Sequence, residues 1–193
     1  MDENEIAECD FSGHPTLKVL SLNKNKLTSG AGLHSLSVLE ELSIQDNETL
    51  TSIKGMDNMT SLKKLNLTGS KLESLSGLPN FPQLEELVLD GNAVATIEEL
   101  PKLGHLTALK KLSMQGTPLA EEKGDDLKKE VLIALMDKLK FLKEVNGEGW
   151  DEELVKECIE TKEQRIQEAI EAAKAAEEAA KAAAENPEGG EEA

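Results

Sequence analysis

A single spacing of apolar residues recurs along most of this chain and restricts what it can fold into. Five segments carry apolar residues at their first, fourth and sixth positions and a small polar residue at the ninth. They begin at Leu17, Leu39, Leu62, Leu84 and Leu109, so the starts lie 22, 23, 22 and 25 residues apart. One such segment cannot bury its apolar residues alone, and we therefore expect the segments to stack.

The segments match the form L-x-x-L-x-L-x-x-N-x-L, the signature of leucine-rich repeats. Each repeat supplies a short strand, and stacked strands form a parallel sheet. The sequence therefore predicts an α/β fold: a leucine-rich-repeat solenoid with a concave parallel sheet, a helical C-terminal cap and a helical acidic tail. The predicted parts are a short N-terminal cap (1–16), five repeats (17–119), a C-terminal cap (120–150) and an Ala/Glu-rich tail (151–193) that is disordered at its end.

The polar residue at position 9 predicts a ladder of side-chain hydrogen bonds. An asparagine amide can satisfy backbone groups of adjacent turns, whereas Ser70 and Thr117 can do so only in part. The apolar residues that follow each strand are expected to line the convex side as short helical or 3₁₀ turns. In the N-terminal cap, Ile6 and Phe11 are the substantial apolar groups.

The C-terminal cap is predicted to start with a helix from Asp125, with Asp125 or Asp126 as its N-cap. The strand frame then returns and ends at Asn146 and Gly147. From Asp151 to Glu185 the chain is rich in helix formers, which predicts a long helix. This helix is either solvated, or a weak coiled coil or partner-binding helix.

Charge and composition narrow the class of partner. The formal net charge is -17, and residues 151–193 hold 14 acidic and 5 basic residues, or -9 of that total. This balance argues against direct nucleic-acid binding and against a bare anionic membrane, and it suits basic protein partners or a solubilising role for the tail. No apolar stretch predicts a membrane span or a secretory signal, so we expect a nuclear or cytoplasmic protein.

Catalytic and cofactor motifs are not visible in the sequence. His14, His34 and His105 lie on predicted loops or convex segments without a nucleophile motif at suitable spacing. Phosphate loops, dinucleotide fingerprints, zinc-ligand spacings and calcium loops are also missing. We therefore expect a non-enzymatic protein without cofactor or metal, in which Cys9 and Cys158 are reduced thiols.

The stretch from Thr96 to Trp150 resembles the closing segment of the acidic leucine-rich nuclear phosphoprotein family. The residues that carry this resemblance are TIEELPKLGHLTALKKLSMQGTPLAEEKGDDLKKEVLIALMDKLKFLKEVNGEGW. The same cap type resembles those of the spliceosomal A-prime protein, the axonemal dynein leucine-rich light chain and the leucine-rich regulatory subunit of protein phosphatase 1. The resemblance implies binding of histones or other basic proteins, or modulation of a phosphatase. Unlike the nuclear family's long Asp/Glu tract, this tail is alanine-rich with interspersed lysines.

Positions 3, 5 and 7 of each repeat are predicted to face outward on the concave sheet. Charges at positions 2 and 3 alternate from strand to strand, so they either neutralise one another or form a mixed patch for a partner. The candidate partner-binding residues are Asn23, Glu41, Gln45, Lys64, Asn66, Thr68, Glu86, Val88, Asp90, Lys111 and Gln115. Trp150 is expected to pack over the end of the solenoid, with partner contact as the alternative.

Two functions remain open at this point. The first is a protein-binding scaffold or regulator that holds a basic or phosphatase-type partner. The second is a structural subunit of a larger assembly of the axonemal dynein or spliceosomal type. In either case we expect a monomer outside its complex and protein partners rather than nucleic acid or membrane.

Overall fold

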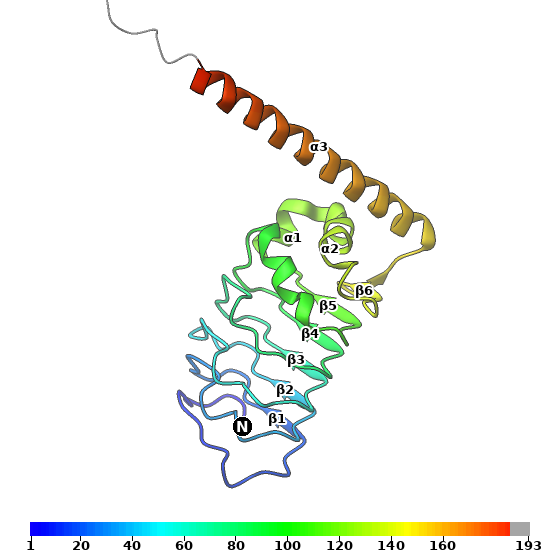
Figure 1. The fold of residues 1–193 in the computed structure, drawn as a ribbon. Coiled ribbons are helices and arrows are strands. Elements are labelled where there is room, and N and C mark those ends of the chain that lie inside the picture. The colour runs from blue at the N-terminus through cyan, green and yellow to red at the C-terminus, as the bar shows by residue number, and fades with distance from the viewer. Residues whose placement is uncertain (186–193) are drawn as a thin grey trace, which may run out of the picture. The chain divides into compact units, whose positions relative to one another are not determined.

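A computed structural model describes residues 1–185 of the chain. The chain divides into two compact units, Met1–Asp151 and a second unit that begins at Glu152. In the first unit, the strands stack one above another in the order of the sequence (Figure 1). This arrangement is that of a leucine-rich-repeat solenoid, as the spacing of the leucines predicted.

Seven short strands of the described chain form one sheet. They are β1 (Val19–Ser21), β2 (Glu41–Ser43), β3 (Lys64–Asn66), β4 (Glu86–Val88), β5 (Lys111–Ser113), β6 (Glu144–Val145) and β7 (Glu148–Gly149), in sheet order β1 to β7. The pairs from β1 to β6 are parallel, and Leu20 pairs with Leu42 and Leu42 with Leu65. Equal repeat positions therefore lie side by side, which aligns each predicted column of side chains.

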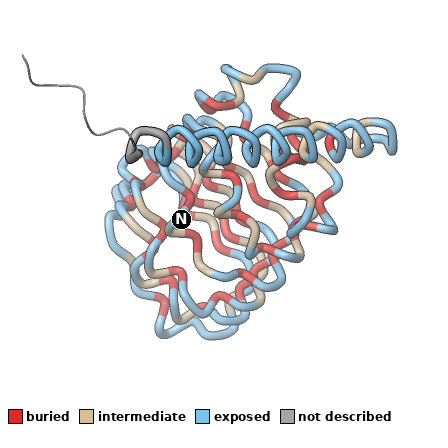
Figure 2. Tube along the Cα trace, turned by 45° about the horizontal axis from the view of Figure 1, so that its top comes forward, coloured by how far each residue is buried: buried red, intermediate tan, exposed pale blue. Residues whose placement is uncertain are grey.

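The core lies behind the sheet, between the strands and the turns of the convex side. The position-4 leucines, from Leu20 to Leu112, are at most 6% exposed. Buried residues recur in every turn of the solenoid (Figure 2). Aliphatic side chains fill nearly all of this core, and burial of each one stabilises the fold by about 1.5–3 kcal/mol.

Within the described repeats, the convex side is built from short turns, as the sequence predicted, and these turns join into a continuous helix in the fourth repeat. In the first three repeats, single turns are closed by hydrogen bonds to the carbonyl three residues earlier, such as that from the Leu36 N–H to the Leu33 carbonyl oxygen. In the fourth repeat, η1, a 3₁₀ helix, spans Ile97–His105. Its nine residues account for the 25-residue spacing between Leu84 and Leu109, the longest of the four. The described backbone of the three preceding repeats makes turns on this side, because the shorter spacing leaves fewer residues for a helix.

The predicted asparagine ladder is present. Asn47 Nδ2 donates to the carbonyl oxygens of Leu22 and Ile44, and its Oδ1 accepts from the Leu27 N–H. In the fourth repeat, two repeats further along the chain, Asn92 makes the equivalent three contacts with Leu67, Leu72 and Leu89. Ser70 occupies the same position between them, and its buried hydroxyl has no hydrogen-bond partner among residues 1–185. The sequence predicted a partial role for Ser70 and Thr117. Ser70 makes none of these contacts, because its side chain is too short, whereas Thr117 Oγ1 donates to the Met114 carbonyl oxygen.

The C-terminal cap contains α1 (Pro118–Lys123), η2 (Gly124–Asp126) and α2 (Leu127–Leu135). The prediction that Asp125 or Asp126 caps the cap helix is wrong. Asp126 already has right-handed helical backbone angles, because η2 runs directly into α2, and its side chain makes no capping hydrogen bond. A side-chain cap is found at the start of the preceding helix α1, which was not predicted: Thr117 Oγ1 accepts from the Ala120 N–H.

A hairpin closes the sheet after the last repeat. β6 continues the parallel sheet beside β5, as the returning strand frame predicted. β7 then pairs antiparallel with β6. Asn146 and Gly147 connect the two strands with φ angles of 54° and 82°. An Asn-Gly pair with positive φ at both residues is typical of a two-residue hairpin turn, and this signal was missed in the sequence.

The N-terminal segment covers the open edge of β1 and the first repeat. The Ile6 N–H donates to Asn25 Oδ1, and the Lys26 N–H donates to the Ile6 carbonyl oxygen. Phe11 is 6% exposed and joins the hydrophobic core. Backbone hydrogen bonds therefore contribute to this cap in addition to the two apolar residues noted in the sequence.

The second unit contains α3 (Glu152–Glu185), a helix of 34 residues that matches the prediction from composition. The predicted i to i+4 ion pair between Glu177 and Lys181 is present at 2.6 Å. Every residue from 163 to 181 is exposed, including Ile166 and Ile170. The expectation of disorder at the end of the tail falls on residues 186–193, outside the described residues.

Candidate protein-binding surface

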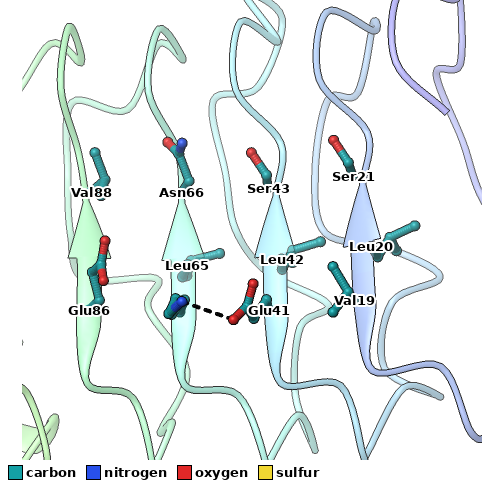
Figure 3. A pocket seen from close by; sticks show the side chains of 11 residues that line it. Val19, Leu20, Ser21, Glu41, Leu42, Ser43, Leu65, Asn66, Glu86 and Val88 are labelled. Atoms are coloured by element: carbon teal, nitrogen blue, oxygen red, sulfur yellow. Dashed lines mark ion pairs between the residues drawn. The ribbon is translucent and has the colours of Figure 1, made fainter.

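The exposed face of the sheet presents positions 3 and 5 of each repeat. Within each three-residue strand the central leucine is buried, and its two neighbours are half-buried or exposed. This follows from the alternation of side chains along a strand. Two rows of side chains therefore cross the sheet: Val19, Glu41 and Glu86 lie in one, and Ser43, Asn66 and Val88 in the other (Figure 3).

The charges at position 2 form ion pairs along the ladder, as the neutralising interpretation predicted. Glu40 accepts from Lys18 at 2.9 Å and from Lys63 at 2.6 Å. Hydrogen bonds from Lys63 first, and then from Lys18, lower the pKa of Glu40 to about 2. Glu85 pairs with Lys110 at 2.7 Å, and this hydrogen bond lowers its pKa below the ordinary value. The position-2 charges of all five repeats are therefore paired with one another.

The charges at position 3 pair less completely. Lys64 Nζ lies 2.9 Å from a carboxylate oxygen of Glu41, and the dashed line in Figure 3 marks this pair. Lys111 lies 2.9 Å from Glu144 in β6. These contacts raise the pKa of each lysine. Glu86 stands between the two lysines and forms no ion pair within residues 1–185, because each lysine is turned toward its other neighbour.

Positions 5 and 7 form a second ladder of hydrogen bonds, which was not predicted from the sequence. Asn23 Oδ1 accepts from Ser43 Oγ at 2.7 Å and from the Gln45 N–H at 2.8 Å in the next repeat. Asp90 Oδ1 accepts in the same way from Ser113 Oγ and the Gln115 N–H. The signal in the sequence was a serine at position 5 that follows an Asn or Asp at position 7 of the preceding repeat.

The N-terminal segment begins this second ladder. Asp2 Oδ1 accepts from Ser21 Oγ at 2.6 Å and from the Asn23 N–H at 2.9 Å. These contacts lower the pKa of Asp2, with the hydrogen bond from Ser21 as the largest cause. The ladder is interrupted in the third and fourth repeats, where Asn66 and Val88 replace serine. There Asn66 Oδ1 accepts from Thr68 Oγ1 and the Thr68 N–H within its own repeat.

A shallow hollow of about 240 Å³ lies over the first four strands. The side chains around it are Val19, Leu20, Ser21, Glu41, Leu42, Ser43, Lys64, Leu65, Asn66, Glu86 and Val88 (Figure 3). Five of the predicted site residues therefore meet there: Glu41, Lys64, Asn66, Glu86 and Val88. Val19 is 60% exposed and was not among the predicted site residues, although an apolar residue among charged ones at position 3 was a visible signal.

The remaining predicted site residues lie outside the hollow. Asn23 and Asp90 are engaged in the second ladder. Gln45 bonds to Asp46, and Gln115 bonds to the Asn146 carbonyl oxygen. Thr68 bonds to Asn66, Lys111 pairs with Glu144, and Trp150 is half-buried against the hydrophobic core. Intramolecular contacts therefore involve all of these side chains.

Metal-binding clusters and membrane-spanning helices are absent from the described part of the chain. Among these residues, no three His, Cys, Asp or Glu side chains gather closely enough to hold a metal ion. No helix within residues 1–185 is both long and apolar enough to cross a membrane. Cys9 and Cys158 are not joined by a disulfide.

Comparisons with known proteins relate this chain to others by fold alone. No protein-family model and no curated protein sequence matches it. A chain in the crystal structure of the Drosophila melanogaster SNF/U2A′ complex is similar, with a TM-score of 0.52, 15% sequence identity and coverage of 86% of each chain. An internalin (inlF) from Listeria monocytogenes has a TM-score of 0.48 and 21% identity over 72% of this chain and 50% of its own.

Proposed function

We propose that this protein is a non-enzymatic interaction scaffold whose concave sheet binds a segment of a partner protein. The proposal rests on the hollow over β1 to β4, where the exposed Val19 lies in one row with charged side chains of β2, β3 and β4. Apolar area that water covers in the free protein is the main source of binding energy when a partner covers it. The surrounding ion pairs are exposed, so each contributes only about 0–1 kcal/mol and a partner can redirect them at little cost.

A basic partner is the finer form of this proposal. The net charge of -17 favours it, and the resemblance of residues 96–150 to the acidic leucine-rich nuclear phosphoprotein family implies histones or a phosphatase. Electrostatic attraction of this kind weakens as salt is added. The protein would then act in the nucleus or cytoplasm, as a monomer outside its complex, and would bind protein rather than nucleic acid.

The second candidate is a structural subunit of a larger assembly. The similarity in fold to a chain of the SNF/U2A′ complex favours it, because that chain is part of an assembly. An apolar contact on the hollow would then hold a stoichiometric complex that resists salt.

A capture experiment from cell lysate tests these proposals. The baits are the full chain, its Val19→Asp and Val38→Asp variants, and a chain that ends at Asp151. Val38 is the matched control, because it is an exposed valine, 39% accessible, that does not line the hollow. A concave partner is lost with Val19→Asp and kept with Val38→Asp. Loss of this partner in high salt and with the shortened chain favours a basic ligand, whereas a salt-resistant complex with both chain lengths favours the assembly subunit.

A further inference from the structure

The position-3 column carries one more negative charge than it can neutralise. It holds the carboxylates of Glu41, Glu86 and Glu144 and the ammonium groups of Lys64 and Lys111, and Val19 occupies its first place. Each of the two lysines forms an ion pair with one glutamate, so one of the three carboxylates is unpaired among the described residues. The lysines at position 2 do not supply the missing charge, since Lys18, Lys63 and Lys110 pair with Glu40 and Glu85.

The unpaired carboxylate lies in the hollow. Lys64 pairs with Glu41 and Lys111 with Glu144, so Glu86 is left over. Glu86 is half-buried and lines the hollow together with Val88 of the same strand. A half-buried carboxylate that forms no ion pair of its own is a favourable place for a cation from another molecule.

Asn66 adds a donor beside this carboxylate. Its Oδ1 is occupied by the Thr68 side chain and N–H, at 2.7 and 3.0 Å. Its Nδ2 donates no hydrogen bond within the described part of the chain. Asn66 and Val88 are also the two residues at which the serine ladder is interrupted. The centre of the hollow thus combines a free acceptor, a free donor and apolar area where the other repeats use the same positions for internal hydrogen bonds.

We propose that the hollow selects a protein segment that presents a lysine or arginine to Glu86 and an aliphatic side chain to Val19. This inference rests on the proposed function of the concave face. Arginine suits the site best, because its planar guanidinium group can bind a carboxylate through two hydrogen bonds. The neighbouring Asn66 amide then donates to a carbonyl oxygen of the bound segment.

The sheet fixes the spacing of the two anchors. Val19 and Glu86 occupy the same position in β1 and β4, so three strand spacings separate them. Strands lie about 4.8 Å apart, which places the two side chains about 14 Å from each other. An extended segment spans this distance in about four residues and a helix in about nine or ten.

A displayed library of random peptides tests the inference on the immobilised full chain. We expect the selected peptides to carry Lys or Arg at one of these spacings from an aliphatic residue. Glu86→Gln should weaken each peptide by about tenfold or more. Glu41→Gln, which removes a carboxylate already paired with Lys64, should weaken it by less than about threefold. The Glu86→Lys variant reverses the charge of the site, so it should bind versions of these peptides in which the selected Lys or Arg is replaced by Glu.

Two further variants distinguish failure of this inference from failure of the proposed function. In one outcome, Val19→Asp weakens peptide binding while Val38→Asp and Glu86→Gln do not. This result would overturn the role of Glu86 but would still place the peptides on the concave sheet. Peptides that are indifferent to all of these substitutions overturn both, because they bind elsewhere. Circular dichroism melting of each variant confirms that the comparison is made between folded proteins.

Discussion

Asn47 donates a hydrogen bond through Nδ2 to the carbonyl oxygen of Leu22 in the preceding repeat, across 3.0 Å. The same side chain also satisfies the Ile44 carbonyl oxygen and the Leu27 N–H. Asn47 is fully buried. Backbone groups of two repeats therefore depend on this one amide, because water does not reach them.

Asn47→Ala should lower the free energy of unfolding by about 2–4 kcal/mol, because it leaves buried backbone groups without partners. Ser70→Ala is the matched control in the next repeat. The Ser70 hydroxyl is buried without a hydrogen-bond partner in the described part of the chain, so its removal should leave stability unchanged or raise it by up to about 1 kcal/mol. Urea unfolding followed by circular dichroism measures both. An equal loss in the two variants would contradict the ladder.

Asp90→Ala should lower the free energy of unfolding by about 1–3 kcal/mol, because Asp90 Oδ1 bridges Ser113 Oγ and the Gln115 N–H. Asp90→Asn should have a much smaller effect. Asn23 makes the same two contacts in its own repeat with an amide oxygen, so a carboxamide is sufficient. Thermal unfolding of the two variants separates the roles of the oxygen and the charge. A large loss with Asp90→Asn would show that the charge matters more than the acceptor.

Thr117→Ala should lower the free energy of unfolding by about 1–2 kcal/mol, since Thr117 caps α1 and donates to the Met114 carbonyl oxygen. Asp126→Ala should change it by less than about 0.5 kcal/mol, because an exposed side chain that makes no capping bond contributes little. Chemical denaturation of the two variants side by side decides between them. A larger effect at Asp126 would restore the cap that the sequence suggested.

Glu40 should make stability depend on pH in the acid range. Its pKa falls from 4.5 to about 2 on folding, because Lys63 and Lys18 donate hydrogen bonds to its carboxylate. A depressed pKa stabilises the folded state above the unfolded value and loses that contribution as pH falls through the folded value. Glu40→Gln should therefore have a lower urea midpoint than the parent above about pH 4.5. This difference should shrink steadily toward pH 2.

Glu73→Gln is the control for the acid series, since Glu73 is exposed and forms no ion pair within the described residues. Its urea midpoint should follow that of the parent at every pH. If the urea midpoints of the parent and Glu40→Gln differed by the same amount down to pH 2, protonation of the Glu40 carboxylate would not be the cause of the pH dependence.

The repeat frame predicted most of the fold, because it depends on the spacing of apolar residues. Once Leu20, Leu42 and Leu65 share a position, their register in the sheet follows. The C-terminal cap was harder to predict, because the N-cap depends on backbone angles near Asp126 rather than on residue type. The hairpin at Asn146 and Gly147 was available from the sequence, since both residue types favour positive φ.

The candidate site was predictable only in part, for a related reason. The columns of positions 3 and 5 follow from strand alternation, so Glu86 and Val88 were correctly expected on the exposed face. The sequence does not show which of two neighbouring glutamates a lysine pairs with. Within residues 1–185, Glu86 is unpaired because Lys64 pairs with Glu41 and Lys111 with Glu144. Nor does the sequence show that Asn23 turns its amide oxygen toward the next repeat.

Site-specific photo-crosslinking shows whether a partner protein binds the concave sheet. A photoreactive side chain replaces Val19 in the hollow or, as the control, Val38 outside it, and each full chain is irradiated in cell lysate. We expect the probe at residue 19 to crosslink a protein partner and the probe at residue 38 not to do so, and we expect Glu86→Lys to reduce the yield. Equal crosslinking from both positions, or from residue 38 alone, would contradict a partner site on the concave sheet.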